Sequence, residues 1–303
     1  MKLDNYWCEN QMTIFDYTQQ EFKIEKPIRL IELFAGVGSQ AMALRDLGAD
    51  FEHHRVVEFD KFAIASYNAI HGTDFPTIDI TKVTGAELGI TDTDKYCYIM
   101  TYSFPCQDLS AAGLGKGMQK GSGTRSGLLW EVERLLNEVE KLPQVLLMEN
   151  VPMVHSSKNM PDFRRWVEFL ESKGYSNFWQ DLNAKDYGVA QNRVRTFMVS
   201  ILGGRDYKFP KPIPLTKTMK DYLEDAVDDR YYINTDRAKQ LINKLIEDGT
   251  ISGSAEHNTT VLLKNQGTEF ERFTTIANTL MARDYKGFGN QGMNGVIEWK
   301  KGI

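Results

Sequence analysis

The sequence contains few cysteines, and they are widely spaced. Cys8, Cys97 and Cys106 are the only three in 303 residues, so the sequence predicts neither a disulfide framework nor a Cys-x-x-Cys metal site. The five histidines are scattered, and none of them is paired with a cysteine at zinc-binding spacing, so we expect no metal ion. A reducing compartment would keep the Cys106 thiol available for chemistry.

Long apolar runs and an excess of basic charge are also lacking. No apolar stretch approaches the roughly 20 residues that span a membrane, and residues 1–22 lack the basic and apolar pattern of a signal peptide. We therefore expect no membrane association and a cytoplasmic location. The net charge of -5 at pH 7 argues weakly against nonspecific coating of nucleic acid, although it allows one basic cleft.

Short apolar strand patterns alternate with helical patterns from residue 28 to residue 202. The strand patterns cover 28–34, 54–59, 96–104, 145–151, 177–183 and 195–202. The helical patterns lie between them, at 39–48, 61–70, 127–142 and 163–174. This alternation predicts an α/β fold in which helices cover both faces of a parallel sheet. Ligands of such sheets bind beyond the carboxyl ends of the strands, so the residues that follow each strand pattern are candidate site residues.

The composition changes after about residue 205. A proline-rich segment at 208–217 is typical of a linker, and a helical pattern from Thr235 to Gly249 precedes a polar, glycine-rich stretch. We therefore predict an N-terminal extension, a catalytic domain and a smaller irregular domain, at 1–27, 28–205 and 206–303.

Two glycines follow the first strand pattern. Gly36 and Gly38 would let the backbone approach a ligand, and the next helix offers unpaired N–H groups at its amino end. An ordinary strand–helix turn has the same pattern, but Glu58, at the end of the next strand pattern, is placed to bind ribose hydroxyls. Because a third glycine and phosphate-binding arginines are missing, a nucleoside cofactor such as S-adenosylmethionine fits better than a dinucleotide. Asp79 is either an adenine contact or a turn residue.

Cys106 directly follows Pro105, which ends a strand pattern because proline cannot donate to a central ladder. The cysteine is either a small core residue or a nucleophile at the carboxyl edge of the sheet, where it would need activation or a well-placed substrate. Cys97 lies within the strand pattern and is predicted to pack in the core.

The most glycine-rich stretch of the chain, residues 111–127, comes just after Cys106. It is either a surface loop or a mobile lid whose cations meet phosphates, and its position favours the lid. The cations are Lys116, Lys120 and Arg125.

Polar residues also end or enter two later strand patterns. Glu149 and Asn150 close an apolar run, where a carboxylate costs desolvation unless it has a partner or a task. It is either a helix cap or ion pair, or a group that hydrogen-bonds or protonates a base. Arg193 and Arg195 fall on one strand face because strand side chains repeat every two residues, which suggests recognition of oxygen acceptors.

Taken in order, these segments resemble the cytosine-5 DNA methyltransferases over roughly residues 28–202. The match runs through ELFAGVGSQ, VVEFD, TIDIT, SFPCQDLS, GTRSGLLWE, MENV and LNAKDYGVAQNRVR. The resemblance implies a Rossmann-like S-adenosylmethionine-dependent methyltransferase sheet with a smaller target-recognition domain at 206–303. It also implies double-stranded DNA as the substrate, in a bacterial or phage restriction-modification or protection role.

The resemblance further assigns roles to single residues. Cys106 would attack carbon 6 of a cytosine flipped out of the duplex, Glu149 would contact the ring nitrogen and amine, and Arg195, with Arg193, would position the cytosine oxygen. Carbon 5 would take the methyl group, a base would remove the proton, and elimination would free the cysteine. The cofactor site would be lined by Phe34, Ala35, Gly36, Gly38, Glu58, Phe59, Asp79, Ile80 and Pro105. The DNA contacts would include Gln107, Ser110, Lys116, Lys120, Arg125, Asn150 and Gln191.

Two segments of the family pattern are lacking after the recognition region: a Thr-Pro-Arg-Glu-like segment and a Gly-Asn segment followed by a helix. Gly289 and Asn290 are present, but Ile303 leaves no room for the helix. A second polypeptide could supply these segments, the enzyme could be shortened and impaired, or the chain could be part of a longer protein. We expect a weakened cofactor site in residues 1–303 alone.

Two alternatives remain at this point. A tRNA cytosine-5 methyltransferase would share the same motifs. A catalytically impaired DNA-binding subunit would keep the fold, but it would have no physical need of Cys106, Glu149 and both arginines.

Overall fold

The computed structural model describes residues 23–109, 117–224, 227–232, 235–249, 261–262, 264–266, 269–271, 276–279 and 296–297. The described residues divide into two units. One contains those up to Asp181 together with Arg195–Phe209, and the other contains Leu182–Val194 and those from Pro210 onward. Cys8 and the Gly289–Asn290 pair lie outside the described residues. Within the described residues, we find no helix that combines the length and the apolar character required to cross a membrane.

A six-stranded sheet forms the centre of the first unit, in the order β2-β1-β3-β4-β7-β5. Its strands are β1 (Ile28–Leu33), β2 (Phe51–Val57), β3 (Cys97–Tyr102), β4 (Val145–Asn150), β5 (Tyr175–Asn183) and β7 (Val194–Leu202). The pairs β1–β2, β1–β3 and β3–β4 are parallel. The mixed order of strands and helices confirms the predicted α/β fold class.

One strand departs from the parallel sheet that the sequence predicts. β7 runs antiparallel to β4, with Val145 opposite Ile201. A parallel neighbour needs a crossover of a dozen or more residues, usually a helix. Only residues 184–193 separate β5 from β7, and they hold a short 3-10 turn and β6 (Gln191–Asn192). The chain therefore reverses direction without a crossover.

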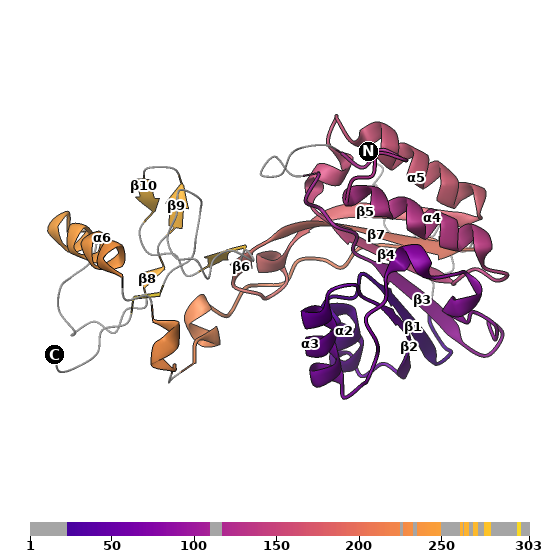
Figure 1. The fold of residues 1–303 in the computed structure, drawn as a ribbon, viewed down its shortest axis with the longest axis horizontal. Coiled ribbons are helices and arrows are strands. Elements are labelled where there is room, and N and C mark those ends of the chain that lie inside the picture. Colours follow the sequence, from indigo (N-terminus) through magenta and orange to yellow (C-terminus); the bar gives the residue numbers. More distant parts are fainter. Residues whose placement is uncertain are drawn as a thin grey trace, which may run out of the picture. The chain divides into compact units, whose positions relative to one another are not determined.

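Helices cover both faces of the sheet, as predicted (Figure 1). They are α2 (Ser39–Asp46), α3 (Lys61–His71), α4 (Leu129–Glu138) and α5 (Met160–Ser172). The alternation of side chains along β1 serves both faces. Leu30 packs in one apolar cluster with Ala41 of α2, whereas Ile31 packs in another with Leu129 of α4 and Trp166 of α5.

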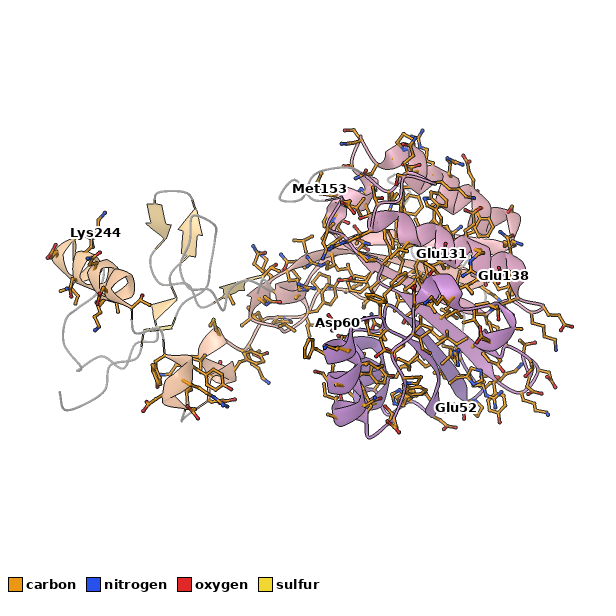
Figure 2. All side chains as sticks on the ribbon, in the orientation of Figure 1. Glu52, Asp60, Glu131, Glu138, Met153 and Lys244 are labelled. Atoms are coloured by element: carbon orange, nitrogen blue, oxygen red, sulfur yellow. The ribbon has the colours of Figure 1, made fainter. Side chains whose placement is uncertain are left out.

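Local signals set the ends of these helices. The Asp60 carboxylate, labelled in Figure 2, accepts hydrogen bonds from the backbone N–H groups of Phe62 and Ala63 and so begins α3. Gly72, with φ 64°, ends the same helix. The helix predicted at 127–142 begins as a 3-10 turn, Ser126–Leu128, and continues as α4. It ends earlier than predicted, at Glu138, because the chain becomes extended at Val139.

The second unit is smaller and irregular. Its helix α6 (Asp236–Glu247) lies inside the predicted Thr235–Gly249 range, and Gly249 has φ 72°. Its short strands are β6, β8 (Val261–Leu262), β9 (Lys264–Gln266), β10 (Glu269–Glu271), β11 (Ala277–Asn278) and β12 (Val296–Ile297). β11 pairs with β6. Residues 191–192 therefore belong to this unit, although β7 of the six-stranded sheet comes soon after them in the chain.

The remaining single turns are 3-10 helices. In the first unit they are Ile80–Lys82, Ala86–Leu88 and Pro152–His155, and in the second they are Ala184–Asp186, Met219–Tyr222 and Asp229–Tyr231.

Gly38 provides a test of the packing beneath the first strand–helix turn. A Cβ there would lie 2.3 Å from His71 Nε2 and 2.6 Å from Tyr67 Cε2, and φ is +78°. Gly48 has a similar φ of +68° but nothing within 4 Å of an added Cβ. We expect Gly38→Ala to lower the free energy of unfolding by at least ~1 kcal/mol more than Gly48→Ala, because only Gly38→Ala adds overpacking to the backbone strain. Urea unfolding of both variants measures this, and equal losses would contradict the packing described here.

Candidate functional site

The first part of the site is the turn between β1 and α2. Gly36 and Gly38 have φ values of 58° and 78°, which L side chains adopt only with strain. The Gly36 N–H donates to Glu58 Oε2 at 2.8 Å, and the other carboxylate oxygen accepts from the Asp60 N–H at 2.7 Å. Glu58 therefore lies beside the glycine turn.

Phe34, at the carboxyl end of β1, has a strained backbone. Its φ of 57° is positive, and it is the non-glycine residue with this conformation among the described parts of the chain. A bulky residue there costs about 1–3 kcal/mol, and such strain gathers at functional sites. The conformation supports the prediction that this position serves a ligand.

Two further predicted cofactor residues come from the segments after β2. Phe59 is 73% exposed, so its ring is open to a planar ligand. The Ile78 N–H donates to the Glu58 carbonyl at 2.8 Å, which brings the following segment to the same edge. Ile80 itself is buried in the core.

Asp79 lies in the segment between α3 and β3. It caps a 3-10 turn and accepts from the Thr81 N–H at 3.0 Å and from the Thr81 hydroxyl at 2.8 Å. These hydrogen bonds hold the pKa of its carboxyl below the usual value. The turn role that the sequence left open is therefore present, and an adenine contact stays a prediction.

Cys106 lies at the carboxyl edge of the sheet, just after β3, and is half-buried. Buried side chains hold the two carbonyls that precede it. Asn150 Nδ2 donates to the Phe104 carbonyl at 3.0 Å, and Ser126 Oγ donates to the Pro105 carbonyl at 2.6 Å. Both peptide planes before the cysteine are therefore fixed. Asn150 is 2% exposed and Ser126 0%, so a DNA contact by Asn150 stays a prediction.

The other predicted cysteine role is confirmed. Cys97 is buried in the core, and burial raises the pKa of its thiol to about 11. A thiol in this state is a packing group rather than a nucleophile.

Hydrogen bonds join the residues that follow Cys106 to the segment that precedes α4. Asp108 Oδ2 accepts from the backbone N–H of Arg125 at 2.8 Å and of Ser126 at 3.4 Å. The Arg125 guanidinium donates to Gln107 Oε1 at 2.6 Å, and the Gly117 N–H donates to the Asp108 carbonyl at 2.9 Å. Two predicted DNA contacts, Gln107 and Arg125, are thus brought together.

Other residues of the predicted lid have different surroundings. The Lys120 ammonium lies 2.9 and 2.8 Å from the two carboxylate oxygens of Glu133 and 5.4 Å from the centre of the Trp130 ring, so it faces α4. A phosphate contact by Lys120 stays a prediction. Ser110 and Lys116 lie outside the described residues.

Glu149 and Arg195 form an ion pair across β4 and β7. Arg195 Nε lies 3.1 Å from Glu149 Oε1, and their side chains are 17% and 21% exposed. β3 and β4 are parallel neighbours with Tyr102 opposite Met148, so Glu149 lies at the sheet edge from which the Cys106 segment emerges. The structure therefore gathers a thiol, a carboxylate and a guanidinium at one edge.

Arg193 and Gln191 belong to the second unit. The Arg193 backbone N–H donates to Asn183 Oδ1 at 3.0 Å, and its carbonyl accepts from the Ala184 N–H at 3.0 Å. Gln191 pairs with Ala277. Their predicted roles beside Arg195 stay predictions.

Sequence reasoning missed three polar residues of this edge: Ser126, Asp108 and Glu32. Glu32 is 0% exposed in β1, and burial raises the pKa of its carboxyl to about 7, although a hydrogen bond from Tyr67 opposes the shift. The position of Glu32 inside the apolar run IRLIELF could have identified it. A buried carboxylate costs desolvation unless it has a partner or a task, which is the argument that singled out Glu149. Nothing in the sequence pattern singled out Ser126 or Asp108.

A glycine turn backed by a carboxylate lies at the same sheet edge as a cysteine and a carboxylate–arginine pair, an arrangement typical of group-transfer enzymes that bind a cofactor. A family model described as C-5 cytosine-specific DNA methylase matches residues 28–297. The chain belongs to this family, and its methyl donor is S-adenosylmethionine. The turn at Gly36, the Glu58 carboxylate and the exposed Phe59 ring fit a nucleoside cofactor.

Named relatives agree with this assignment. The chain is 31% identical to "Orphan methyltransferase M.SssI" of Spiroplasma monobiae, an alignment that covers 88% of this chain and 76% of the relative. It is 33% identical to "Type II methyltransferase M2.ScrFI" of Lactococcus lactis subsp. cremoris, over 69% of this chain and 71% of the relative.

Solved structures show the same fold. The S. pombe Dnmt2 methyltransferase superposes with a TM-score of 0.56 at 22% identity, over 72% of this chain and 66% of that one. The Entamoeba histolytica methyltransferase EhMeth gives 0.58 at 16% identity, over 75% of this chain and 67% of that one. The chain thus spans about two thirds of each of these solved proteins.

Ser126 tests whether the carbonyl clamps position the cysteine. We expect Ser126→Ala to lower kcat for methyl transfer about tenfold, with KM for the cofactor changed less than about twofold, because the Pro105–Cys106 peptide loses its fixed orientation. The matched control is Ser172→Ala, since Ser172 Oγ also donates to a carbonyl, that of Phe169 at 2.6 Å, but on the exposed side of α5. Equal kcat values for both variants would contradict the role of Ser126.

Glu32 tests the cost of burying a carboxylate. The folded-state pKa is about 7 against an ordinary 4.5, so between these pH values the folded protein keeps a proton that the unfolded chain releases. Stability must therefore fall as pH rises from about 4.5 to 7. We expect Glu32→Gln to gain roughly 3 kcal/mol relative to the wild type between pH 4.5 and pH 8. Urea unfolding across this range measures the difference, and a constant difference would contradict it.

Proposed function

We propose that the chain methylates carbon 5 of cytosine in double-stranded DNA through a covalent bond between Cys106 and carbon 6. The observation that carries this proposal is the shared sheet edge. Cys106 follows β3, the Glu149–Arg195 pair lies on β4 and β7, and the glycine turn follows β1. A cytosine between the thiol and the turn would therefore meet a nucleophile on one side and the cofactor on the other.

The proposed chemistry begins at Cys106. Its thiolate sulfur bonds to carbon 6, and the electrons of the carbon 5–carbon 6 double bond move toward carbon 5. A protonated Glu149 carboxyl would donate to the ring nitrogen and accept from the exocyclic amine, which favours the attack. Arg195 holds Glu149 and positions the cytosine oxygen. Carbon 5 then bonds to the electrophilic methyl group that the bound cofactor would supply, and the demethylated cofactor is the leaving group. A base then removes the carbon 5 proton, the carbon 6–sulfur bond breaks, and the thiolate is released.

The cofactor side of the site is proposed to use the residues around the glycine turn. The Gly36 and Gly38 conformations let the backbone approach the ligand closely. Glu58 keeps acceptor capacity for ribose hydroxyls, because each carboxylate oxygen accepts one hydrogen bond in the structure and has a further lone pair. Phe59 offers an exposed ring for stacking, and Asp79 an acceptor for the adenine.

DNA recognition is proposed to involve both units. The target base must leave the stack to reach Cys106, and the adjacent Gln107–Arg125 pair supports contacts near the vacated position. Arg193, Gln191 and the irregular second unit would face the rest of the duplex and read the sequence. Relatives named as type II and orphan methyltransferases support a role in restriction-modification or protection. A second polypeptide that completes the cofactor site stays a prediction from the sequence alone.

The covalent step is tested with duplex DNA that carries 5-fluorocytosine, because fluorine at carbon 5 blocks the final elimination. We expect an adduct that survives denaturing electrophoresis in the wild type and in the control Cys97→Ala, and none in Cys106→Ala. An adduct formed by Cys106→Ala would contradict the proposal.

The nucleic acid is tested in the same preparation with tritiated cofactor. We expect methylation of duplex DNA and none of tRNA. Methylation confined to tRNA would replace the proposed substrate with the tRNA alternative while leaving the role of Cys106 intact.

A further inference from the structure

A buried acid lies directly beneath the cofactor turn, and the proposed chemistry does not use it. Glu32 is the fifth residue of β1, and its side chain lies on the face of Ile28 and Leu30, toward α2 and α3. It is 0% exposed. Oε2 accepts a hydrogen bond of 2.5 Å from the Tyr67 hydroxyl of α3. Oε1 has no hydrogen-bond partner within the described part of the chain.

The hydrogen bond from Tyr67 continues to a histidine. His53 Nδ1, on β2, lies 2.6 Å from the Tyr67 oxygen. A hydroxyl has one hydrogen, and Tyr67 donates it to Glu32. When Glu32 is ionised, His53 must therefore donate from Nδ1, which sets its tautomer. The result is a chain of donors from His53 through Tyr67 to Glu32.

Helix α3, which carries Tyr67, also supports the cofactor turn. His71, one helical turn after Tyr67 on α3, lies 3.0 Å from the Val37 carbonyl through Nε2 and must donate to it. The Tyr67 and His71 rings are 4.4 Å apart, and both lie against Gly38, where an added Cβ would overlap them. The position of Tyr67 thus sets the surface on which Val37 and Gly38 rest.

We propose that ionised Glu32 is a positioning residue for the cofactor: it anchors Tyr67 and, through α3, holds the glycine turn in the shape that binds the nucleoside. Protonation reverses the chain of hydrogen bonds, so that Glu32 donates to Tyr67, Tyr67 donates to His53 Nδ1, and the neutral His53 ring carries its own proton on Nε2 instead of Nδ1. A charge-assisted bond, which is about twice as strong, is then replaced by a neutral one. The inference rests on the assignment of this turn as the cofactor site.

The reversal falls near neutral pH. The titratable groups that face Glu32 are Tyr67 of α3 and, behind it, His53 of β2 and His71 of α3, while α2 presents the buried Ala41. Burial raises the pKa of Tyr67 far above its usual value, so that its hydroxyl stays protonated. Burial and the neighbouring His71 lower the pKa of His53. The change in charge near pH 7 is therefore that of Glu32.

The experiment measures the Kd of S-adenosylhomocysteine by calorimetry between pH 6 and pH 8.5. This probe has an uncharged sulfur, so a direct attraction between Glu32 and a sulfonium does not contribute. We expect wild-type affinity to rise about fivefold with pH across this range. Glu32→Gln should bind with the weak low-pH affinity throughout. Tyr67→Phe should also lose the pH dependence, and it keeps the ring against Gly38. The exposed Glu140→Gln is the control and should keep the wild-type profile.

The possible outcomes are distinct. Affinity that is independent of pH in the wild type, or a wild-type slope retained in both Glu32→Gln and Tyr67→Phe, overturns the positioning role and leaves the proposed function intact. Absence of binding at every pH overturns the assignment of the turn as the cofactor site, and this inference with it. If Glu32 had a purely structural role, Glu32→Gln would bind more weakly than the wild type by the same factor at every pH and would keep the wild-type slope. That result would also overturn the proposal.

Discussion

The register of three parallel strands is the constraint on which the site depends. Leu33 of β1 lies opposite Tyr102 of β3, and Tyr102 lies opposite Met148 of β4, so the three strands end at one edge. Each strand brings different chemistry to this edge: a glycine turn follows β1, a cysteine follows β3, and β4 carries near its end a carboxylate paired with an arginine. Because parallel strands share a direction, these groups meet although they are far apart in sequence. β7 runs the other way, and so it delivers Arg195 to this edge at its start rather than at its end.

Buried polar groups then fix the details that the sheet leaves open. Residues 103–109, the described start of the loop after β3, have no ladder partner, and the carbonyls of Phe104 and Pro105 are held instead by Asn150 and Ser126. Asp108 ties the same loop to the start of α4. Each of these side chains satisfies a backbone group that would be costly to bury alone. Hydrogen bonds therefore hold the backbone on both sides of Cys106.

The edge also contains features that cost stability. Phe34 has a positive φ, and Glu32 is a carboxylate in the core with one oxygen unpartnered in the described structure. Glu32 lies in β1 and Phe34 directly follows it, so both are within a few residues of the glycine turn. Strain and buried charge are retained where function requires a particular geometry. Their position next to the turn supports the proposed role of Glu32 in cofactor binding.

The sequence by itself determined the α/β class, the position of each main strand and helix within a few residues, and the family, because apolar periodicity and short motifs are local properties. It also singled out Cys106, Glu149, Gly36, Gly38 and Glu58, since each breaks or ends a regular pattern. Only the tertiary structure decided that β7 is antiparallel, that Asp79 caps a turn, and that residues 182–194 belong with the second unit. It alone placed Ser126 behind Cys106 and Tyr67 beneath the turn. These depend on contacts between residues distant in the chain, whose hydrogen bonds leave no periodic trace in the sequence.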